Sequence, residues 1–504
     1  MNGLPEIHDC PDSIGDMTSL TQFVIDSATP DILEKVKAIK KRLNFVGEVE
    51  HNVHVMETSG CSSIVDLVGL TCSELVLKNI QNVRNPEDAD RVKLRDKSNI
   101  RVLKLFWKNQ GGGSVLDRLV PPRTLESFWL VGYRSNEFPD WMLDISSYLP
   151  FLSELTLRDL QACDCLPPFG ALPNLRRLCL MNIPNLGKIG KEFYGEGGPC
   201  MKLRVLLLRS MENLVEWWTT ESSEETEEFL IPNLHYLEVQ DCPKLKFLPY
   251  PPTSMNWVLN NSETIFPEGG FGKLSSSVRP CMMVLTSCSL SPEKWEDRLQ
   301  HFPTVEIFRV NSVSGLRTLP EAMRCFTSLT LLWLVSLNDL ETLPVWLGHL
   351  SSLVEIGIRD CPNLTSLPES MKNLTALKIL RLLECKGLET LPEWLGQLTC
   401  LEILFIDCPN LTCLPESMKN LTALKILRLV RWKGVEILPE WLGQLTCLEE
   451  LSIGDCPNLT SLPGSIKSLS ALKLLRIVLC PNLTARCQGE DAHKICHIPK
   501  VLLL

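Results

Sequence analysis

Apolar residues recur at fixed positions through residues 319–485, with the same intervals from one segment to the next. Aligned on its Leu-Pro dipeptides, this stretch divides into seven units, six of 24 residues and one of 23 (residues 391–413). The second half of each 24-residue unit follows the pattern L-x-x-L-x-L-x-x-C, with Leu337 or Trp432 in place of the cysteine in two of them, and Cys408 of the 23-residue unit comes one position earlier. Copies in register at this period predict an array of stacked structural repeats, a solenoid.

The two central leucines of each unit predict a short strand. Leu380 and Leu382 are two residues apart and share one face, whereas Arg381 points the other way. One unit cannot bury its apolar face alone, but stacked units form a continuous core and a parallel sheet on the concave side. The Leu-Pro dipeptide turns the chain back, and a short helical or 3₁₀ turn returns it along the convex side. The expected inward pairs are Leu380/Leu382, Leu404/Ile406, Leu427/Leu429 and Leu451/Ile453. The predicted fold is therefore an α/β leucine-rich-repeat solenoid, or horseshoe.

The rest of the chain is less regular. We expect irregular repeats with inserts over residues 1–318, the seven regular units over 319–485 and a tail over 486–504. A helix is predicted at residues 31–42 and a charged helical insert, with an acidic first turn after Pro86, between residues 79 and 99. Because no polar capping segment precedes the first repeats, we expect further sequence upstream in the native gene product.

The outward strand positions of the regular units supply the candidate binding residues. Aromatic and arginine side chains in a concave groove are the types enriched at binding hot spots. The middle strand position carries Trp333, Gly357, Arg381, Phe405, Arg428, Ser452 and Arg476. Charged residues that follow in the same repeats are Arg359, Asp360, Glu384, Asp407, Arg431 and Asp455. The predicted partner contacts are Trp333, Arg359, Arg381, Phe405, Asp407, Arg428, Arg431, Asp455 and Arg476.

Two further rows of residues, one directly before the strands and one on the return side, are expected to have structural roles. Charges alternate at the residue before the strands, in the order Lys378, Glu402, Lys425, Glu449 and Lys473. Neighbouring strands are about 4.8 Å apart, so these side chains are expected to pair laterally as a solvated ladder. On the return side, Trp346, Trp394 and Trp441 recur in every second unit. They either cover the neighbouring repeats, the interpretation we favour, or form a second interface.

Charge and hydropathy narrow the class of partner. The formal net charge is −10, and the most basic run, residues 35–42, is short. This balance argues against a nucleic-acid partner. No apolar run reaches the length of a membrane span, and the first residues lack the basic start and apolar core of a secretory signal. Protein partners in a cytosolic or nuclear compartment are therefore expected.

The cysteines support a reducing compartment. Five of the 21 cysteines, Cys361, Cys385, Cys408, Cys456 and Cys480, fall on one repeat position. A small, buried, weakly hydrogen-bonding side chain suits that position. Paired C-x₂-C motifs at zinc spacing are absent from the sequence. We therefore predict buried free thiols and neither a metal nor a disulfide framework.

No motif in the sequence indicates catalysis or a cofactor. The glycine-rich run at residues 269–273 resembles a phosphate-binding loop, but Leu274 stands where the Walker pattern requires a hydroxyl residue. The eight histidines are scattered, and neither H-E-x-x-H nor G-x-S-x-G occurs. Asn-x-Thr sequons recur with the repeat, at Asn363, Asn373, Asn410, Asn420, Asn458 and Asn482, and are expected to stay unmodified. The sequence predicts no enzyme.

Several motifs outside the leucine pattern carry a resemblance to a known family. They are VRNPEDA at residues 83–89 before a strand ending in Trp107, FPDW at 138–141, LPPFG at 166–170, IGKEFYG at 189–195 and RCQGED at 486–491. With them the chain resembles, over nearly its whole length, the leucine-rich-repeat region of plant nucleotide-binding disease-resistance proteins of the cereal type. In that family the repeats sense pathogens and restrain a switch domain that binds ATP or ADP. The coiled-coil and switch domains are missing here, so no nucleotide site carries over to any residue.

Three functions remain open from the sequence. The resemblance implies the recognition and autoinhibitory module of an intracellular plant immune receptor, which contacts a pathogen effector, a guarded host protein or the switch domain. A stand-alone repeat scaffold, adaptor or decoy would equally lack a switch domain. The ectodomain of a secreted receptor is disfavoured by the first residues and by the cysteine row.

Overall fold

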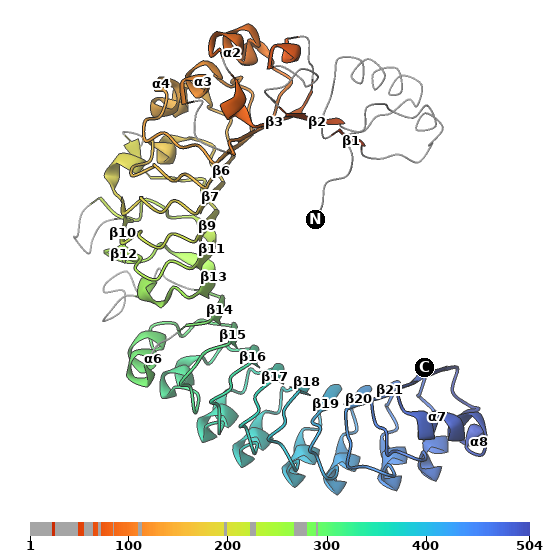
Figure 1. The fold of residues 1–504 in the computed structure, drawn as a ribbon. Coiled ribbons are helices and arrows are strands. Elements are labelled where there is room, and N and C mark those ends of the chain that lie inside the picture. Colours follow the sequence, from red (N-terminus) through yellow and green to blue (C-terminus); the bar gives the residue numbers. More distant parts are fainter. Residues whose placement is uncertain are drawn as a thin grey trace, which may run out of the picture. The chain divides into compact units, whose positions relative to one another are not determined.

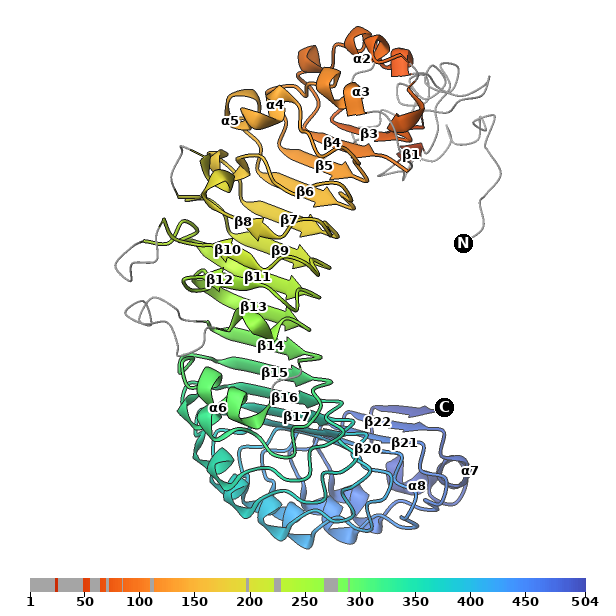
Figure 2. The ribbon, with the colours of Figure 1, turned by 60° about the vertical axis from the view of Figure 1, so that its left-hand side comes forward.

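The structure, a computed structural model, describes residues 23–25, 49–54, 64–68, 72–83, 85–108, 113–195, 199–221, 228–266, 280–288 and 291–504. The predicted helix at residues 31–42 and the glycine-rich run at 269–273 lie outside the described residues. The chain divides into two compact units, residues 1–253 and 254–504. Both consist of parallel strands that follow one another in chain order, as Figures 1 and 2 show within each unit.

In the first unit, each strand of the main sheet pairs with the next strand of that sheet along the chain. Its strands are β1 (Phe23–Ile25), β2 (Val49–His54), β3 (Glu74–Lys78), β4 (Val102–Phe106), β5 (Ser127–Val131), β6 (Glu154–Arg158), β7 (Arg177–Met181), β9 (Val205–Arg209) and β11 (Leu234–Gln240). The α-helices on the return side are α2 (Glu87–Arg91), α3 (Gly113–Arg118), α4 (Asp140–Leu143) and α5 (Ile145–Tyr148). The 3₁₀ helices are η2 (Ile64–Leu67), η3 (Ile80–Asn82), η4 (Leu94–Asp96), η5 (Phe169–Ala171) and η6 (Lys191–Phe193). Helix α2 is the predicted charged insert with its acidic first turn.

A second, smaller sheet in this unit was not predicted. It joins β8 (Lys188–Ile189), β10 (Glu216–Trp218) and β12 (Lys246–Leu248) in parallel. Trp217 is fully buried at its centre and donates its indole N–H to the Tyr194 hydroxyl, 3.0 Å away. Strands of two or three residues leave too short a pattern to be recognised in the sequence.

In the second unit, the sheet runs from β13 to β23. Its strands are β13 (Ser254–Asn260), β14 (Met282–Thr286), β15 (Ile307–Asn311), β16 (Leu331–Val335), β17 (Glu355–Arg359), β18 (Ile379–Leu383), β19 (Ile403–Asp407), β20 (Ile426–Val430), β21 (Glu450–Gly454), β22 (Leu474–Val478) and β23 (Lys500–Leu503). The strands line the inner side of this unit (Figure 1). Strand β23, in the segment expected as a tail, extends the same sheet.

On the outer side of the second unit, each repeat returns through a short helix that follows the Leu-Pro dipeptide. These 3₁₀ helices are η10 (Glu321–Cys325), η11 (Val345–His349), η12 (Glu369–Asn373), η13 (Glu393–Gln397), η14 (Glu416–Asn420), η15 (Glu440–Gln444) and η16 (Gly464–Ser468), and η8 (Glu263–Ile265) precedes them. The α-helices are α6 (Pro292–Leu299), α7 (Pro481–Gln488) and α8 (Ala492–Ile495). Proline occupies the residue before each of η10 to η16 with an extended backbone, where it ends the preceding segment.

The core is the predicted leucine ladder. Leu380, Leu404 and Leu427 follow one another in register and are fully buried, and the other expected inward residues are at most 2% exposed. The five cysteines of the repeat row are buried beside this ladder, as predicted, and each has a free thiol in the structure. Cys385 Sγ, for example, lies 3.4 Å from the Leu383 carbonyl oxygen and 3.6 Å from that of Ile358. The repeat assignment is therefore confirmed in the second unit.

Candidate protein-binding face

The outward side chains of β16 to β22 form a row because the strands pair without a shift in register. Trp333 lies opposite Gly357, Gly357 opposite Arg381, and Arg381 opposite Phe405. The row continues through Arg428, Ser452 and Arg476. The predicted middle-position residues are thus brought together on one face of the second unit.

Within this row, aromatic rings and guanidinium groups alternate. The Arg381 guanidinium lies 5.7 Å from the Trp333 ring centroid and 5.2 Å from that of Phe405. The Arg428 guanidinium, on the next strand, lies 4.6 Å from the Phe405 ring centroid. Each such cation–π contact stabilises by about 0.5–1 kcal/mol at exposed sites. We call Trp333, Arg381, Phe405 and Arg428 the aromatic–arginine stack.

Two glutamates hold the arginines of the stack in place. Glu355 on β17 forms an ion pair with Arg381 and accepts the Trp333 indole N–H at 2.8 Å. Glu450 on β21 pairs with Arg428 at 3.0 Å. Both glutamates keep less than a fifth of their side-chain surface exposed. Partly buried, shared carboxylates fix the two long arginine side chains, so the stack is preorganised.

Sequence reasoning missed Glu355 and Glu450. A signal was present, because both stand at a strand position that is aliphatic in the neighbouring regular units. A charged residue on an otherwise apolar row indicates a specific partner for that charge.

Half-buried aliphatic side chains surround the stack. Ile379, Ile403 and Ile426 lie in register along one side of it, and Leu383 and Val430 lie along the other. Aromatic and aliphatic surface around paired arginines, with further charged groups outside it, is the usual anatomy of a protein–protein interface.

A second charged network lies at the far ends of these strands. Arg431 makes a bidentate ion pair with Asp407, at 2.6 and 2.5 Å, and lies 3.8 Å from Glu384. Arg359 reaches the same Glu384 at 3.1 Å. The hydrogen bond to Asp407 raises the pKa of Arg431 above its ordinary value. Four of the predicted charges therefore form one lateral network.

The missing residue of the 23-residue unit explains this geometry. In most repeats, a residue with positive φ follows the strand, as at Asp360, Glu384 and Asp455. The short unit lacks that residue, and strand β19 ends on Asp407 directly before Cys408. The next repeat has Arg431 at the positive-φ position, and this arginine takes the bidentate pair with Asp407.

Three of the four lateral pairs predicted for the alternating ladder form. Glu402 bridges Lys378 at 3.2 Å and Lys425 at 2.7 Å, and Lys473 pairs with Glu449 at 2.6 Å. Hydrogen bonds from Lys425 and Lys378 lower the pKa of Glu402. These pairs are accessible to water, which screens their charges, so they contribute little to stability.

Two predicted residues stay outside these networks. Arg476 is exposed and has no ion-pair partner among the described residues. Asp455 is half-buried at the end of β21, with φ of 49°. On the return side, Trp346 and Trp394 are buried and Trp441 is half-buried, which favours the covering role over a second interface.

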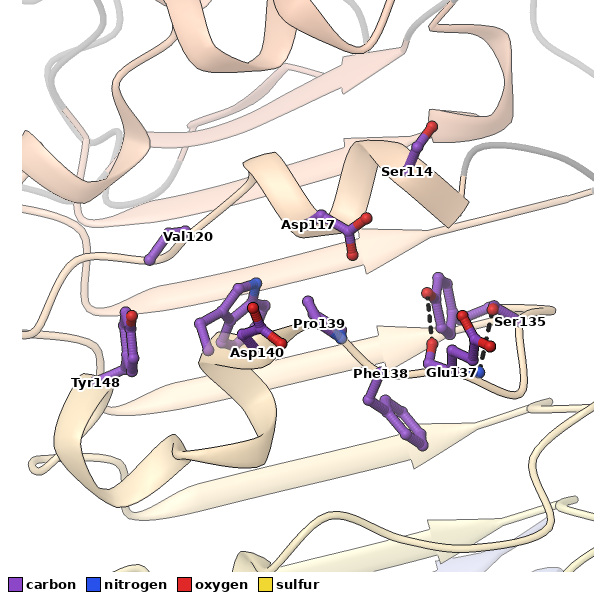
Figure 3. Close-up of a pocket in the computed structure, with 11 residues that line it drawn as sticks. Ser114, Asp117, Val120, Ser135, Glu137, Phe138, Pro139, Asp140 and Tyr148 are labelled. Atoms are coloured by element: carbon purple, nitrogen blue, oxygen red, sulfur yellow. Dashed lines mark hydrogen bonds between the residues drawn. The ribbon is translucent and has the colours of Figure 1, made fainter.

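The first unit contains a pocket of about 640 Å³ between α3, α4 and α5, shown in Figure 3. Its lining includes Asp117, Glu137, Asp140 and the rings of Phe138 and Tyr148. Burial raises the pKa of the lining residue Tyr133, whose hydroxyl donates to the Glu137 carbonyl oxygen. The three acids lie on the exposed surface, so the pocket offers no desolvated carboxyl group as a general acid. Among the described residues no cluster of histidine, cysteine or acidic side chains could hold a metal ion.

Comparison with known proteins identifies the repeats. The family model described as R13L1/DRL21 LRRs matches residues 64–183, and a leucine-rich repeat region model matches residues 367–497. The chain is a leucine-rich-repeat protein related to plant disease-resistance proteins. The disease resistance protein RGA2 of Solanum bulbocastanum is 28% identical over 40% of this chain and 22% of that protein. A disease resistance RPP13-like protein of Arabidopsis thaliana is 28% identical over 38% of this chain and 20% of its own length.

The leucine-rich-repeat chain thus spans about a fifth of the length of these relatives. Solved structures with similar repeats include the leucine-rich repeat domain of the type III effector XopL, 27% identical, which covers 41% of this chain and 71% of that one with a TM-score of 0.36. TLR13, solved in complex with ssRNA13, is 18% identical and covers 86% of this chain and 62% of its own with a TM-score of 0.48. None of the described helices is both long and apolar enough to cross a membrane.

Proposed function

We propose that this chain is the protein-recognition and autoinhibitory module of an intracellular plant immune receptor. It contacts a pathogen effector, a guarded host protein or the nucleotide-binding switch domain through the inner face of the second unit. The relationship of the repeats to those of disease-resistance proteins supports the biological setting. The buried free thiols support a cytosolic or nuclear location, where disulfides are rare.

The observation that carries the proposal is the aromatic–arginine stack with its aliphatic surroundings. Tryptophan and arginine are enriched at hot spots, and rigid side chains lose little entropy when a partner binds. Since Glu355 and Glu450 already neutralise Arg381 and Arg428, the centre of this face presents ring surfaces and aliphatic groups rather than unpaired charge. It therefore suits an apolar or aromatic anchor from a protein, and the net charge of −10 disfavours nucleic acid.

The test is a triple substitution in the stack, Arg381→Ala, Phe405→Ala and Arg428→Ala together. The control replaces Lys372 and Lys419, whose exposed pairs with Glu369 and Glu416 lie on the return side. Binding of proteins from plant extract, and the immune response of a receptor that carries these repeats, should fall with the triple variant and not with the control. If the triple variant melts like the parent and still binds every partner of the parent, this face is not the recognition surface.

The second candidate is a stand-alone scaffold, adaptor or decoy that uses the same face. It shares the binding chemistry and differs only in having no switch domain to regulate. Loss of partner binding without any effect on a co-expressed switch domain would favour it.

A further inference from the structure

We propose that the inner face carries a second subsite, at β22 and β23, which accepts an acidic side chain beside a bulky aliphatic side chain of the protein partner. We call it the corner site, and it consists of Arg476, Leu479, Lys500, Leu502 and Leu504. The proposal deepens the function proposed above and rests on it, because it describes chemistry that the same partner would need.

Two cations without carboxylate partners lie together at this corner. Arg476 lies opposite Leu502 in the ladder, and Lys500 lies opposite Leu474. The side chains of Arg476 and Lys500 therefore face the same side, with Cα atoms roughly 8 Å apart from strand spacing and rise. Both residues are exposed, and neither forms an ion pair with any residue that the structure describes.

The arginines on β17 to β20, and Arg431 directly after β20, all have a carboxylate partner. Arg359, Arg381, Arg428 and Arg431 each contact a carboxylate of this chain. Glu450, the carboxylate on the strand next to Arg476, is already engaged by Arg428 and by the Ser452 hydroxyl. On the other neighbouring strand, the corresponding position is the cation Lys500. The corner thus has two cationic side chains with which no carboxylate side chain of the described residues forms an ion pair.

An exposed leucine, three residues after Arg476, has an unfavourable backbone conformation. Leu479 has φ of 53° and is 68% exposed. The same repeat position holds a polar residue elsewhere in the second unit, namely Asn261, Ser287, Ser312, Ser336, Asp360, Glu384, Arg431 and Asp455. Leucine gains nothing locally from this position, since positive φ strains it and water surrounds it. A strained residue that the core does not require points to a contact made outside the chain.

The apolar surface continues around Leu479. Its N–H donates to the Leu504 carbonyl oxygen at 3.0 Å, and Leu504 is 71% exposed. Val478 and Leu502 are half-buried beside it. Charge complementarity therefore selects a carboxylate for Arg476 and Lys500, and the aliphatic border selects a bulky apolar neighbour for that carboxylate.

The experiment uses the full chain and an array of short synthetic peptides. Each peptide has one glutamate and one leucine at varied separation in a Gly/Ser background. Matched peptides carry glutamine, lysine or phosphoserine in place of glutamate, or serine in place of leucine. The parent should bind the best glutamate–leucine peptides roughly tenfold more tightly than their glutamine counterparts, and added salt should reduce this preference.

Three variants locate the binding. Arg476→Gln should abolish the preference for glutamate, and Leu479→Asn should abolish the preference for leucine. Asparagine tolerates positive φ, so the second variant should fold at least as well as the parent. Arg309→Gln is the control, because Arg309 is an exposed cation on β15 of the same unit with no ion pair to a described residue. Its effect on peptide binding should be absent.

The corner site is refuted if glutamine peptides bind as well as glutamate peptides, or if Arg476→Gln keeps the glutamate preference. Binding of the phosphoserine peptides alone, or an equal loss in Arg309→Gln, would also refute it. The proposed function fails by a different result, namely unchanged partner binding by the triple variant of the aromatic–arginine stack. The two proposals can therefore fail separately.

Discussion

The Trp333 indole lies flat across Gly357 on the neighbouring strand. A Cβ atom at Gly357 would come within 2.6 Å of the ring atoms of Trp333. The ring can adopt this position only because residue 357 has no side chain, and there it reaches Glu355 and borders Arg381. One glycine on β17 therefore sets the geometry of the first half of the stack.

We expect Gly357→Ala to displace the indole without unfolding the repeat. The lost hydrogen bond and cation–π contact cost about 1–2 kcal/mol, and alanine returns roughly 0.5–1 kcal/mol because glycine is unfavourable inside a strand. The net stability change is small, but the N–H resonance of Trp333 should move. The control is Gly454→Ala on β21, where the new Cβ would lie 3.7 Å from Val430. An unchanged Trp333 resonance in Gly357→Ala would contradict the packing described.

On the return side, glycines let repeats pack in pairs. A Cβ at Gly396 would lie 2.1 Å from the backbone carbonyl oxygen of Ser417, and one at Gly348 would lie 2.0 Å from that of Ser370. Gly396→Ala should therefore destabilise the protein by at least about 2 kcal/mol, since a backbone atom cannot move aside as a side chain can. Urea unfolding measures this. Gly464→Ala is the matched control, with its nearest neighbour 3.8 Å away, and equal stability losses in the two variants would rule out the paired packing.

The leucine ladder and most of the alternating Lys/Glu pairs could be predicted from the sequence, whereas the ion pairs that hold the aromatic–arginine stack could not. Leu404 is recognisable because burial recurs with the period of the strand and the repeat. The ion pairs of Glu355 and Glu450 depend on which half-exposed side chain each arginine contacts on an adjacent strand. That choice depends on the side-chain rotamers, about which the repeat period carries no information.

The Asp407–Arg431 ion pair could not be predicted from the sequence either. The shortened unit is visible in the sequence, but its effect on the positive-φ position appears only once the strands are in place. The roles of the predicted contact residues remain predictions.

The caps of the return helices should make stability depend on pH. Hydrogen bonds from the backbone N–H groups of Ser417 and Glu416 hold the pKa of Glu393 below its ordinary value of 4.5. A group whose folded pKa is lowered stabilises the fold above the unfolded pKa and loses that effect as pH falls through the folded value. Glu393→Gln should therefore reduce stability at neutral pH and flatten its decline below about pH 4.5. Thermal melts across this range, with Glu389→Gln as an exposed control, test it, and parallel curves for Glu393→Gln and the parent would argue against the cap.

Leu404→Ala tests the ladder itself. Leu404 is fully buried between the register partners Leu380 and Leu427, so its truncation should cost about 2–5 kcal/mol. Because each repeat is held only by its neighbours, the loss should open the stack locally before the rest unfolds. Hydrogen exchange would detect faster exchange in β18 to β20. Ile403→Ala, on the half-exposed row of the same strand, should cost clearly less, and a comparable cost would mean that the ladder is not the main source of stability.

The thiols separate into two classes that alkylation should distinguish. Burial raises the pKa of Cys361 to about 12, and Cys385, Cys408 and Cys456 are equally enclosed, whereas Cys400, Cys413 and Cys447 are exposed. Because the thiolate is the reacting species, iodoacetamide should label the exposed set at least about tenfold faster in the native protein. The difference should vanish in denaturant, which serves as the control.

Protein isolated from its own compartment should also contain no disulfide among the four buried cysteines. A disulfide found there by mass spectrometry would overturn both the buried-thiol assignment and the proposed cytosolic or nuclear location, since such bonds persist only in oxidising compartments.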